Sequence, residues 1–198
     1  PRIGAKRRKF CKRLRLLRER CKTDFCSKMC ADLRRIIRRG RVSLFTESRA
    51  YKIVSGDVSR GRVSHAYLLV CPDERNLRTY LKELAKLVMR ADERAARLID
   101  EEMHSDCRVF PAEGEKTAVS DVKELLEGCY IKPVEGDKKV FVLDCMQEML
   151  PPAQNKLLKV LEEPPENVYF VLGATSEFPV LATVKSRSKR LDLFSFPQ

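Results

Sequence analysis

The sequence has no long apolar run and no segment typical of an export signal. None of its 198 residues lie in a stretch approaching the ~20 consecutive apolar residues that a membrane-spanning helix needs. The arginine-rich beginning lacks the apolar centre of a signal peptide. We therefore expect a cytoplasmic protein without membrane contact. We also expect its eight cysteines to be reduced thiols, several of them filling core space.

Positive charge is concentrated at the beginning of the chain. The formal net charge is +12, yet residues 1–42 contain 17 lysines and arginines against three acidic residues, a net charge of +14, so the remainder carries −2. We predict a basic extension over residues 1–50, either helical or disordered. Two interpretations stay open for residues 1–42: solvated basic helices, or a contact with nucleic acid or another acidic partner through counterion release.

Four cysteines in this extension are candidate zinc ligands: Cys11, Cys21, Cys26 and Cys30. Their spacing lacks the paired C-x2-C knuckles of typical structural zinc sites. We therefore predict no metal site, and zinc binding by these four residues stays an open hypothesis.

Residues 51–198 have the length and pattern of one α/β domain. Short continuous apolar runs alternate with helical patterns, which indicates a parallel sheet covered on both faces, here with five strands. The expected strands are 66–70, 108–110, 140–143, 168–172 and a last one near 190–194; the expected helices are 77–89, 120–127 and 153–161. Asp144 and Thr175 follow two of these strands, at the edge where ligands gather in such sheets.

The run from Ala153 to Pro165, AQNKLLKVLEEPP, combines a helix with its stop signal. Leu157, Leu158 and Leu161 form an apolar stripe at helical spacing. The two prolines, Pro164 and Pro165, end the helix because proline cannot donate to the helical ladder and restricts the preceding residue. The pattern alone indicates an amphipathic helix packed on a sheet and names no function.

The same run resembles a signature of the bacterial DNA polymerase III clamp-loader subunits, the delta-prime and gamma/tau proteins of the AAA+ class. Further segments resemble this family in its own order, between Gly61 and Phe196: the entry to the first strand (61–69), the Walker B strand (138–144), the sensor 1 strand (167–175) and the SRC motif (183–188). The resemblance implies an AAA+ core of the RecA-like P-loop NTPase type, without the family's lid and collar domains. The stretch 89–106, where the family often carries zinc cysteines, has none.

The nucleotide motifs are degraded. A P-loop, G-x-x-x-x-G-K-[ST], needs glycines whose amides wrap the phosphates, a lysine for their charge and a hydroxyl for magnesium. Aligned without gaps from His65, the two glycine positions hold Cys71 and Asn76, and the lysine and hydroxyl positions hold Leu77 and Arg78. After the Walker B remnant Asp144, Cys145 stands where an active ATPase of this class has its catalytic glutamate. We expect a degenerate nucleotide site with no cofactor.

Arg187 falls on the arginine of the SRC motif, which in clamp loaders reaches the ATP of an adjacent subunit. The resemblance to delta-prime therefore implies a non-hydrolysing subunit in DNA replication, not itself catalytic, whose Arg187 serves a neighbour as an arginine finger. The implied partners are gamma/tau and delta subunits, the sliding clamp and primed DNA. The alternatives are an active gamma/tau-type ATPase and a basic nucleic-acid-binding protein on an inherited AAA+ scaffold; a merely solvated Arg187 in the basic cluster 185–190 also stays open.

Overall fold

The computed structural model describes residues 42–112, 115 and 119–193. The chain divides into two units, Pro1–Ser43 and Leu44–Gln198. Residues 1–41 of the basic extension, with the four cysteines and the predictions made for them, lie outside the described residues. Phe45 and Ala50 are buried in the core of the second unit, so the boundary expected after residue 50 falls inside this unit.

Five parallel strands form one sheet, as the apolar runs predicted. They are β1 (Ala66–Val70), β2 (Cys107–Phe110), β3 (Lys139–Leu143), β4 (Val168–Ala174) and β5 (Lys189–Asp192), in the spatial order β2-β3-β4-β1-β5. The carboxyl ends of β1, β3 and β4 therefore lie beside one another at one edge of the sheet. Asp144 and Thr175 follow two of these ends, where the sequence placed them.

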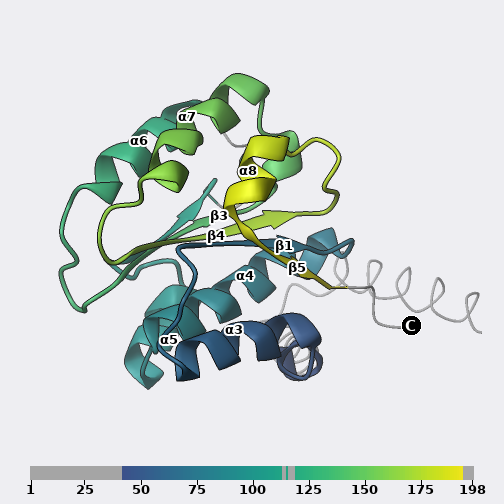
Figure 1. Cartoon of the computed structure of the whole chain (residues 1–198). Coiled ribbons are helices and arrows are strands. Elements are labelled where there is room, and N and C mark those ends of the chain that lie inside the picture. Colours follow the sequence, from purple (N-terminus) through teal and green to yellow (C-terminus); the bar gives the residue numbers. More distant parts are fainter. Residues whose placement is uncertain (1–41, 113–114, 116–118, 194–198) are drawn as a thin grey trace, which may run out of the picture. The chain divides into compact units, whose positions relative to one another are not determined.

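Helices cover both faces of the sheet (Figure 1). One face carries α3 (Arg49–Ser59), α4 (Glu74–Met89) and α5 (Glu93–Asp100). The other carries α6 (Val119–Cys129), α7 (Pro151–Glu162) and α8 (Ala182–Arg187), and a short 3-10 turn, η1 (Met146–Glu148), precedes α7. The fold is thus a three-layered α/β sandwich.

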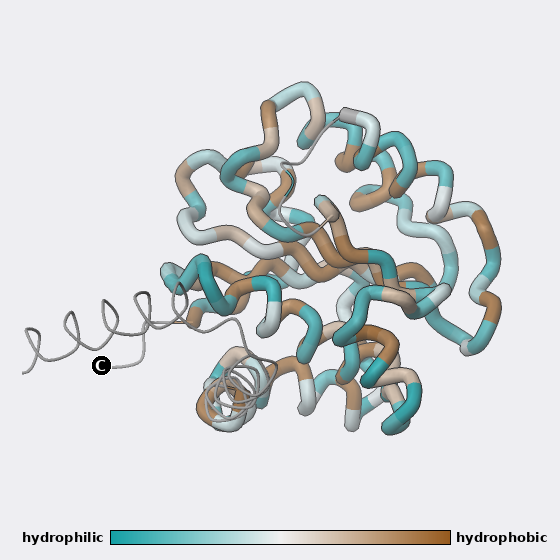
Figure 2. The backbone as a smooth tube through the Cα atoms, turned by 180° about the vertical axis from the view of Figure 1, so that it is seen from behind, coloured by the Kyte–Doolittle hydropathy of each residue, from teal (hydrophilic) through white to brown (hydrophobic). Residues whose placement is uncertain are grey.

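Alternate residues of β1, β2, β3 and β4 belong to separate cores on the two faces, because successive strand side chains point to opposite sides. In β1, Tyr67 and Leu69 pack under α3 and α4, whereas Leu68 joins the core under α6, α7 and α8. Figure 2 shows the mostly hydrophobic, brown strands in the centre and outer helices in which hydrophilic and hydrophobic residues alternate. At Gly173, a Cβ atom would lie 2.5 Å from Leu81 Cδ1, so α4 packs closely against β4 because this position has no side chain.

Some helix ends differ from the sequence expectation for local reasons. Helix α7 begins at Pro151 rather than Ala153, because proline is tolerated in the first turn, where its missing N–H has no intrahelical partner. Helix α4 begins at Glu74 rather than Leu77, directly after Asp73. Three helices, α3, α5 and α8, were not predicted as elements. Ile99 is the one buried residue of α5, and α8 has six residues, so both lack a long apolar stripe.

Within the described part of the chain, the helices are all too short or too polar to cross a membrane.

Candidate functional site

The connection from β1 to α4 stands where a P-loop would wrap phosphates, and it consists of three residues, Cys71–Asp73. Its polar groups bond to one another and to the sheet. Cys71 N–H donates to the Ala174 carbonyl (2.9 Å), and the Asp73 carbonyl accepts from Leu77 N–H (3.0 Å). The side chain of Asn76 donates to the Asp73 carboxylate (2.5 Å). These amides are therefore engaged within the protein, and the connection lacks the glycine loop that a P-loop places before its helix.

The residue at the lysine position of the P-loop pattern, Leu77, belongs to the hydrophobic core. Leu77 is fully buried on α4, in the cluster that also contains Tyr80 and Leu81. A side chain in this place contacts apolar groups and has no route to a phosphate. Cys71 is buried as well, and burial raises the pKa of its thiol, which therefore stays protonated at neutral pH.

Arg78, which stands at the Ser/Thr position of the P-loop pattern, is the centre of a charged network. Its Nε and Nη2 donate to the two carboxylate oxygens of Glu102 at 2.7 and 2.6 Å, and Nη2 also donates to the Pro111 carbonyl at 2.9 Å. Lys82 Nζ lies 2.5 Å from Glu102 Oε1. Burial acts to raise the pKa of Glu102, but the bonds from Arg78 and Lys82 outweigh it and hold that pKa below its usual value.

Asp144, at the end of β3, is drawn into the same network. Its Oδ2 lies 3.9 Å from Arg78 Nη1, and its Oδ1 accepts from Cys145 N–H at 2.8 Å, so this carboxylate orients the turn after the strand. Burial raises the pKa of Asp144 against the opposing effects of Cys145 and Arg78. A guanidinium thus stands beside the carboxylate where an active site of this class holds magnesium.

Cys145, which follows Asp144, cannot act as a general base at neutral pH. Burial and the nearby Asp144 raise the pKa of the Cys145 thiol to about 12, so it does not ionise at neutral pH. Glu148 is exposed on η1, and its backbone N–H donates to the Cys145 carbonyl. At the end of β4, Thr175 N–H donates to Gln147 Oε1 (3.1 Å), a partner that the sequence did not indicate. The residues present at these strand ends therefore do not fit a magnesium–ATP complex.

Arg187 lies elsewhere, as the last residue of α8. Its Nη2 lies 2.6 Å from Glu162 Oε1, at the end of α7, and its Nη1 donates to the Thr183 carbonyl at 3.1 Å. The side chain remains 34% exposed. The arginine is thus attached to two helices and still faces solvent.

Every other member of the basic cluster 185–190 also has a partner. Lys185 Nζ donates to the Glu177 carbonyl at 3.3 Å, and Arg190 pairs with the Glu177 and Asp192 carboxylates at 2.5 and 2.8 Å. Lys189 bonds to Asp57 on α3 at 2.5 Å, and Asp57 also accepts from the Tyr67 hydroxyl at 3.0 Å. The cluster is therefore a set of fixed cations around α8, not a run of freely solvated side chains.

Gln154, the glutamine of the AQN run, fixes the other end of α8. It is fully buried, and its amide nitrogen donates to the Met149 and Pro179 carbonyls at 2.9 and 3.1 Å. Its carbonyl oxygen accepts from the N–H of Leu181, the residue that caps α8, at 2.9 Å. Helix α7 therefore contacts α8 at both ends, through Gln154 and Glu162. The sequence indicated the run from Ala153 to Pro165 as a helix, but it did not predict these two contacts.

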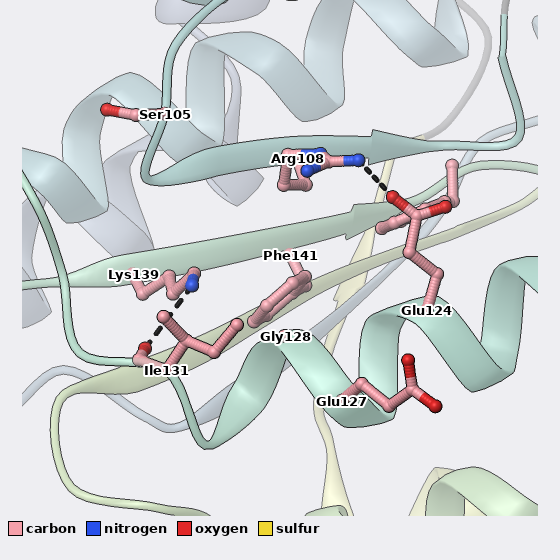
Figure 3. A pocket seen from close by; sticks show the side chains of 9 residues that line it. Ser105, Arg108, Glu124, Glu127, Gly128, Ile131, Lys139 and Phe141 are labelled. Carbon is pink, nitrogen blue, oxygen red and sulfur yellow. Dashed lines mark hydrogen bonds and ion pairs between the residues drawn. The ribbon is translucent and has the colours of Figure 1, made fainter.

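A hollow of about 180 Å³ lies between α6 and the strands β2 and β3 (Figure 3). Its floor is apolar, with Phe141, and its charged side chains already have partners. Arg108 pairs with Glu124, and Lys139 donates to the Ile131 carbonyl at 3.2 Å. The hollow therefore presents no convergent set of unpaired polar groups.

No cluster of His, Cys, Asp and Glu side chains that could hold a metal ion occurs in residues 42–112, 115 and 119–193. The four cysteines in these ranges, Cys71, Cys107, Cys129 and Cys145, are free thiols.

A family model described as DNA polymerase III, delta subunit, matches residues 46–197. The chain belongs to this family. The match includes all five strands and both regions described above, the strand ends around Asp144 and the helix that carries Arg187.

Curated relatives are similar over most of the same residues. DNA polymerase III subunit gamma of Buchnera aphidicola is 31% identical over 142 residues, 68% of this chain and 39% of that protein. Subunit delta' of Yersinia pestis is 31% identical over 148 residues, 69% of this chain and 44% of that protein. The chain thus spans about two fifths of the length of these two relatives.

Solved structures show the same fold. A DNA polymerase III gamma subunit-related protein from Thermotoga maritima superposes with a TM-score of 0.59 at 24% identity, covering 76% of this chain and 47% of that one. The Bacillus subtilis DNA clamp loader delta protein has a TM-score of 0.51 at 13% identity, covering 74% and 43%. The chain therefore shares its architecture with these two solved structures.

Proposed function

We propose that this chain acts in DNA replication as a non-hydrolysing, delta-prime-like subunit of a DNA polymerase III clamp loader. In this role it binds and cuts no ATP itself, and it supplies Arg187 to the ATP site of a neighbouring gamma/tau subunit. The assembly, with a delta subunit, places the sliding clamp on primed DNA. The observation that carries the proposal is the contrast between a nucleotide position filled by Leu77 and Arg78 and an Arg187 that stays exposed.

The chemistry of the proposed role is electrostatic. During phosphoryl transfer, negative charge spreads over the transferred group, and a guanidinium supplied by a neighbour stabilises it. Arginine fingers in GTPases contribute about 10³ to 10⁵ in rate. Arg187 supports this role because its side chain is fixed by Glu162 and the Thr183 carbonyl and is still partly exposed.

The test is the DNA-stimulated ATPase of a reconstituted loader that contains Arg187→Ala. We expect assembly to be intact and turnover at the neighbouring site to fall by ~10²-fold or more. Arg190→Ala is the matched control, because Arg190 is a nearby exposed arginine that pairs with Glu177 and Asp192. Turnover that is unchanged in Arg187→Ala, or that falls equally in both variants, would sink the finger hypothesis.

The sequence identity between this chain and the gamma and tau/gamma subunits supports one alternative function, that of an active ATPase. A thermal-shift titration of the chain with Mg-ATP distinguishes the two functions. The proposed function predicts no change in the unfolding temperature at millimolar Mg-ATP, whereas a shift that saturates at micromolar nucleotide would establish the alternative.

The charge of residues 1–42 supports a second alternative, direct binding of nucleic acid. Deletion of these residues would then abolish DNA or RNA binding. A loader subunit instead still associates with gamma/tau after the deletion, because the contacts proposed for Arg187 belong to the α/β unit.

A further inference from the structure

We propose that Glu162 is a positioning residue for Arg187, whose guanidinium it holds in the orientation that meets a phosphate of the neighbouring subunit. The inference rests on the function proposed above. It gives a functional role to a glutamate at the end of α7, where the sequence indicated only a helix and its stop signal.

The geometry fixes the guanidinium at two points. Glu162 Oε1 engages Nη2 from the end of α7, and the Thr183 carbonyl engages Nη1 from within α8. A planar group held at Nη2 by an ion pair with α7 and at Nη1 by a hydrogen bond within α8 cannot rotate freely about its long side chain. Gln154 fixes the start of α8 to α7, so the backbone that carries Arg187 is held as well.

The pairing leaves donors available. A guanidinium has five N–H groups, and no described residue accepts from Arg187 Nε–H. This N–H lies on the same edge of the guanidinium as Nη2, which pairs with Glu162, so Nε–H remains available to donate to a phosphate oxygen. With 34% of the side chain exposed, the guanidinium is oriented by Glu162 without being covered by it.

Such an arrangement favours catalysis through preorganisation. An arginine side chain loses conformational entropy when it is immobilised. Because the Glu162 carboxylate already orders Arg187, less of this entropy is lost during the reaction step. The effect concerns the transition state, where charge develops, more than the binding of ground-state ATP. We therefore expect Glu162 to influence kcat of the neighbouring site and to leave KM nearly unchanged.

The opposite arrangement, in which Glu162 withholds Arg187 from the phosphate, is an outcome of the same experiment. Loss of the carboxylate would then raise turnover. Because 47% of the Glu162 side chain is exposed, we expect its substitution to leave the fold intact in either case.

The experiment measures DNA-stimulated ATPase in a reconstituted loader with Glu162→Ala and Glu162→Gln. We expect kcat to fall about three- to tenfold in Glu162→Ala, with KM within about twofold of the unaltered loader. Glu162→Gln, which keeps an oxygen acceptor, should restore part of the loss. Glu163→Gln is the matched control, because Glu163 is the next residue, is exposed and forms no ion pair with any described residue.

The result is separable from that of the proposed function. If Arg187→Ala leaves turnover unchanged, the proposed function fails. If Arg187→Ala lowers turnover but Glu162→Ala behaves like Glu163→Gln, or increases turnover, only the positioning role is overturned. In the Arg187→Ala background, Glu162→Ala should cause no further loss, and an additional loss would contradict action through Arg187.

The geometric premise is tested on the chain alone. The nitrogen-15 relaxation of Arg187 Nε–H should show an ordered side chain that becomes mobile in Glu162→Ala and stays ordered in Glu163→Gln. Equal mobility in all three proteins would contradict the positioning role, whatever the loader assay shows.

Discussion

Arg78 and Arg187 both pair with a glutamate, in two regions of the same α/β unit. Arg78 grips both oxygens of Glu102, touches the Pro111 carbonyl and faces Asp144, with 17% of its side chain exposed. Arg187 uses one oxygen of Glu162 and is 34% exposed. The Arg78 guanidinium donates to partners inside the fold, whereas the Arg187 guanidinium keeps an N–H donor without a described acceptor. The contrast is the basis for the proposal that the strand ends around Asp144 stabilise the fold and that Arg187, at the end of α8, contacts another molecule.

The largest expected effect on stability belongs to Gln154, which joins α7 to α8. Gln154→Leu keeps the approximate volume but leaves the Leu181 N–H and the Met149 and Pro179 carbonyls without their partner. We expect a loss of about 3 kcal/mol in the free energy of unfolding, measured by urea denaturation. The exposed neighbour Asn155, replaced by Ala, is the control, and equal losses in both would show that Gln154 has no special structural role.

The second effect tests the buried side of the comparison. Arg78→Ala removes the bidentate partner of Glu102 and leaves the Pro111 carbonyl without its donor. Because both charged side chains are mostly buried, we expect a loss of about 2 kcal/mol in unfolding free energy. Arg75→Ala, an exposed arginine on the same helix, should change it by less than about 0.5 kcal/mol. If Arg78→Ala changed the unfolding free energy as little as Arg75→Ala, the contrast between Arg78 and Arg187 would be wrong.

The third effect is a dependence on pH. Glu102 and Asp57 have folded-state pKa values below their ordinary values of 4.5 and 3.8. Their contribution to stability is therefore complete above those values and is lost as the pH falls through the lowered pKa values; Asp144, with a raised pKa, acts in the opposite direction. In Glu102→Gln, the decline in unfolding free energy as the pH falls below about 4.5 should become shallower.

Glu124→Gln provides the matched variant for this pH experiment, because Glu124 pairs with Arg108 at an exposed position. Its acid-induced decline should match that of the unaltered chain. If Glu102→Gln also leaves the decline unchanged, then the Arg78 network does not contribute to the pH dependence.

The smallest expected effect belongs to the exposed side of the comparison. Arg187→Ala should lower the unfolding free energy by less than about 0.5 kcal/mol, because an exposed ion pair contributes little. Thermal and urea unfolding of the isolated chain measure this directly. A loss as large as that of Arg78→Ala would show that Arg187 is a structural residue like Arg78.

The sequence predicted the sheet well because its strands are short, apolar and regularly spaced. The five predicted strands all occur, and β1 has the predicted bounds, Ala66–Val70. The pattern of α5 was too polar to reveal a helix, since only Ile99 is buried there. Helix α8 is too short to show periodicity, although Arg187 was singled out on it through family resemblance.

The partners of the site residues could not be predicted in the same way. Arg78 and Glu102 are 24 residues apart, and Leu181 and Gln154 are 27 apart, so no local spacing connects them. The gapless alignment also assumed a phosphate loop of family length, whereas three residues join β1 to α4. Leu77 and Arg78 therefore lie on the helix itself, one turned into the core and the other into a charged network.

The bond between Asp57 and Lys189 joins residues separated by 132 positions. Asp57 lies on α3 and Lys189 begins β5, which docks beside β1. During synthesis on the ribosome, this docking must wait until almost the whole unit has emerged, and such long-range parallel pairing is intrinsically slow. Helix α8, which Ser188 separates from Lys189, is therefore among the last parts of the α/β unit to reach its place, so Arg187 takes up its position only when this unit has folded.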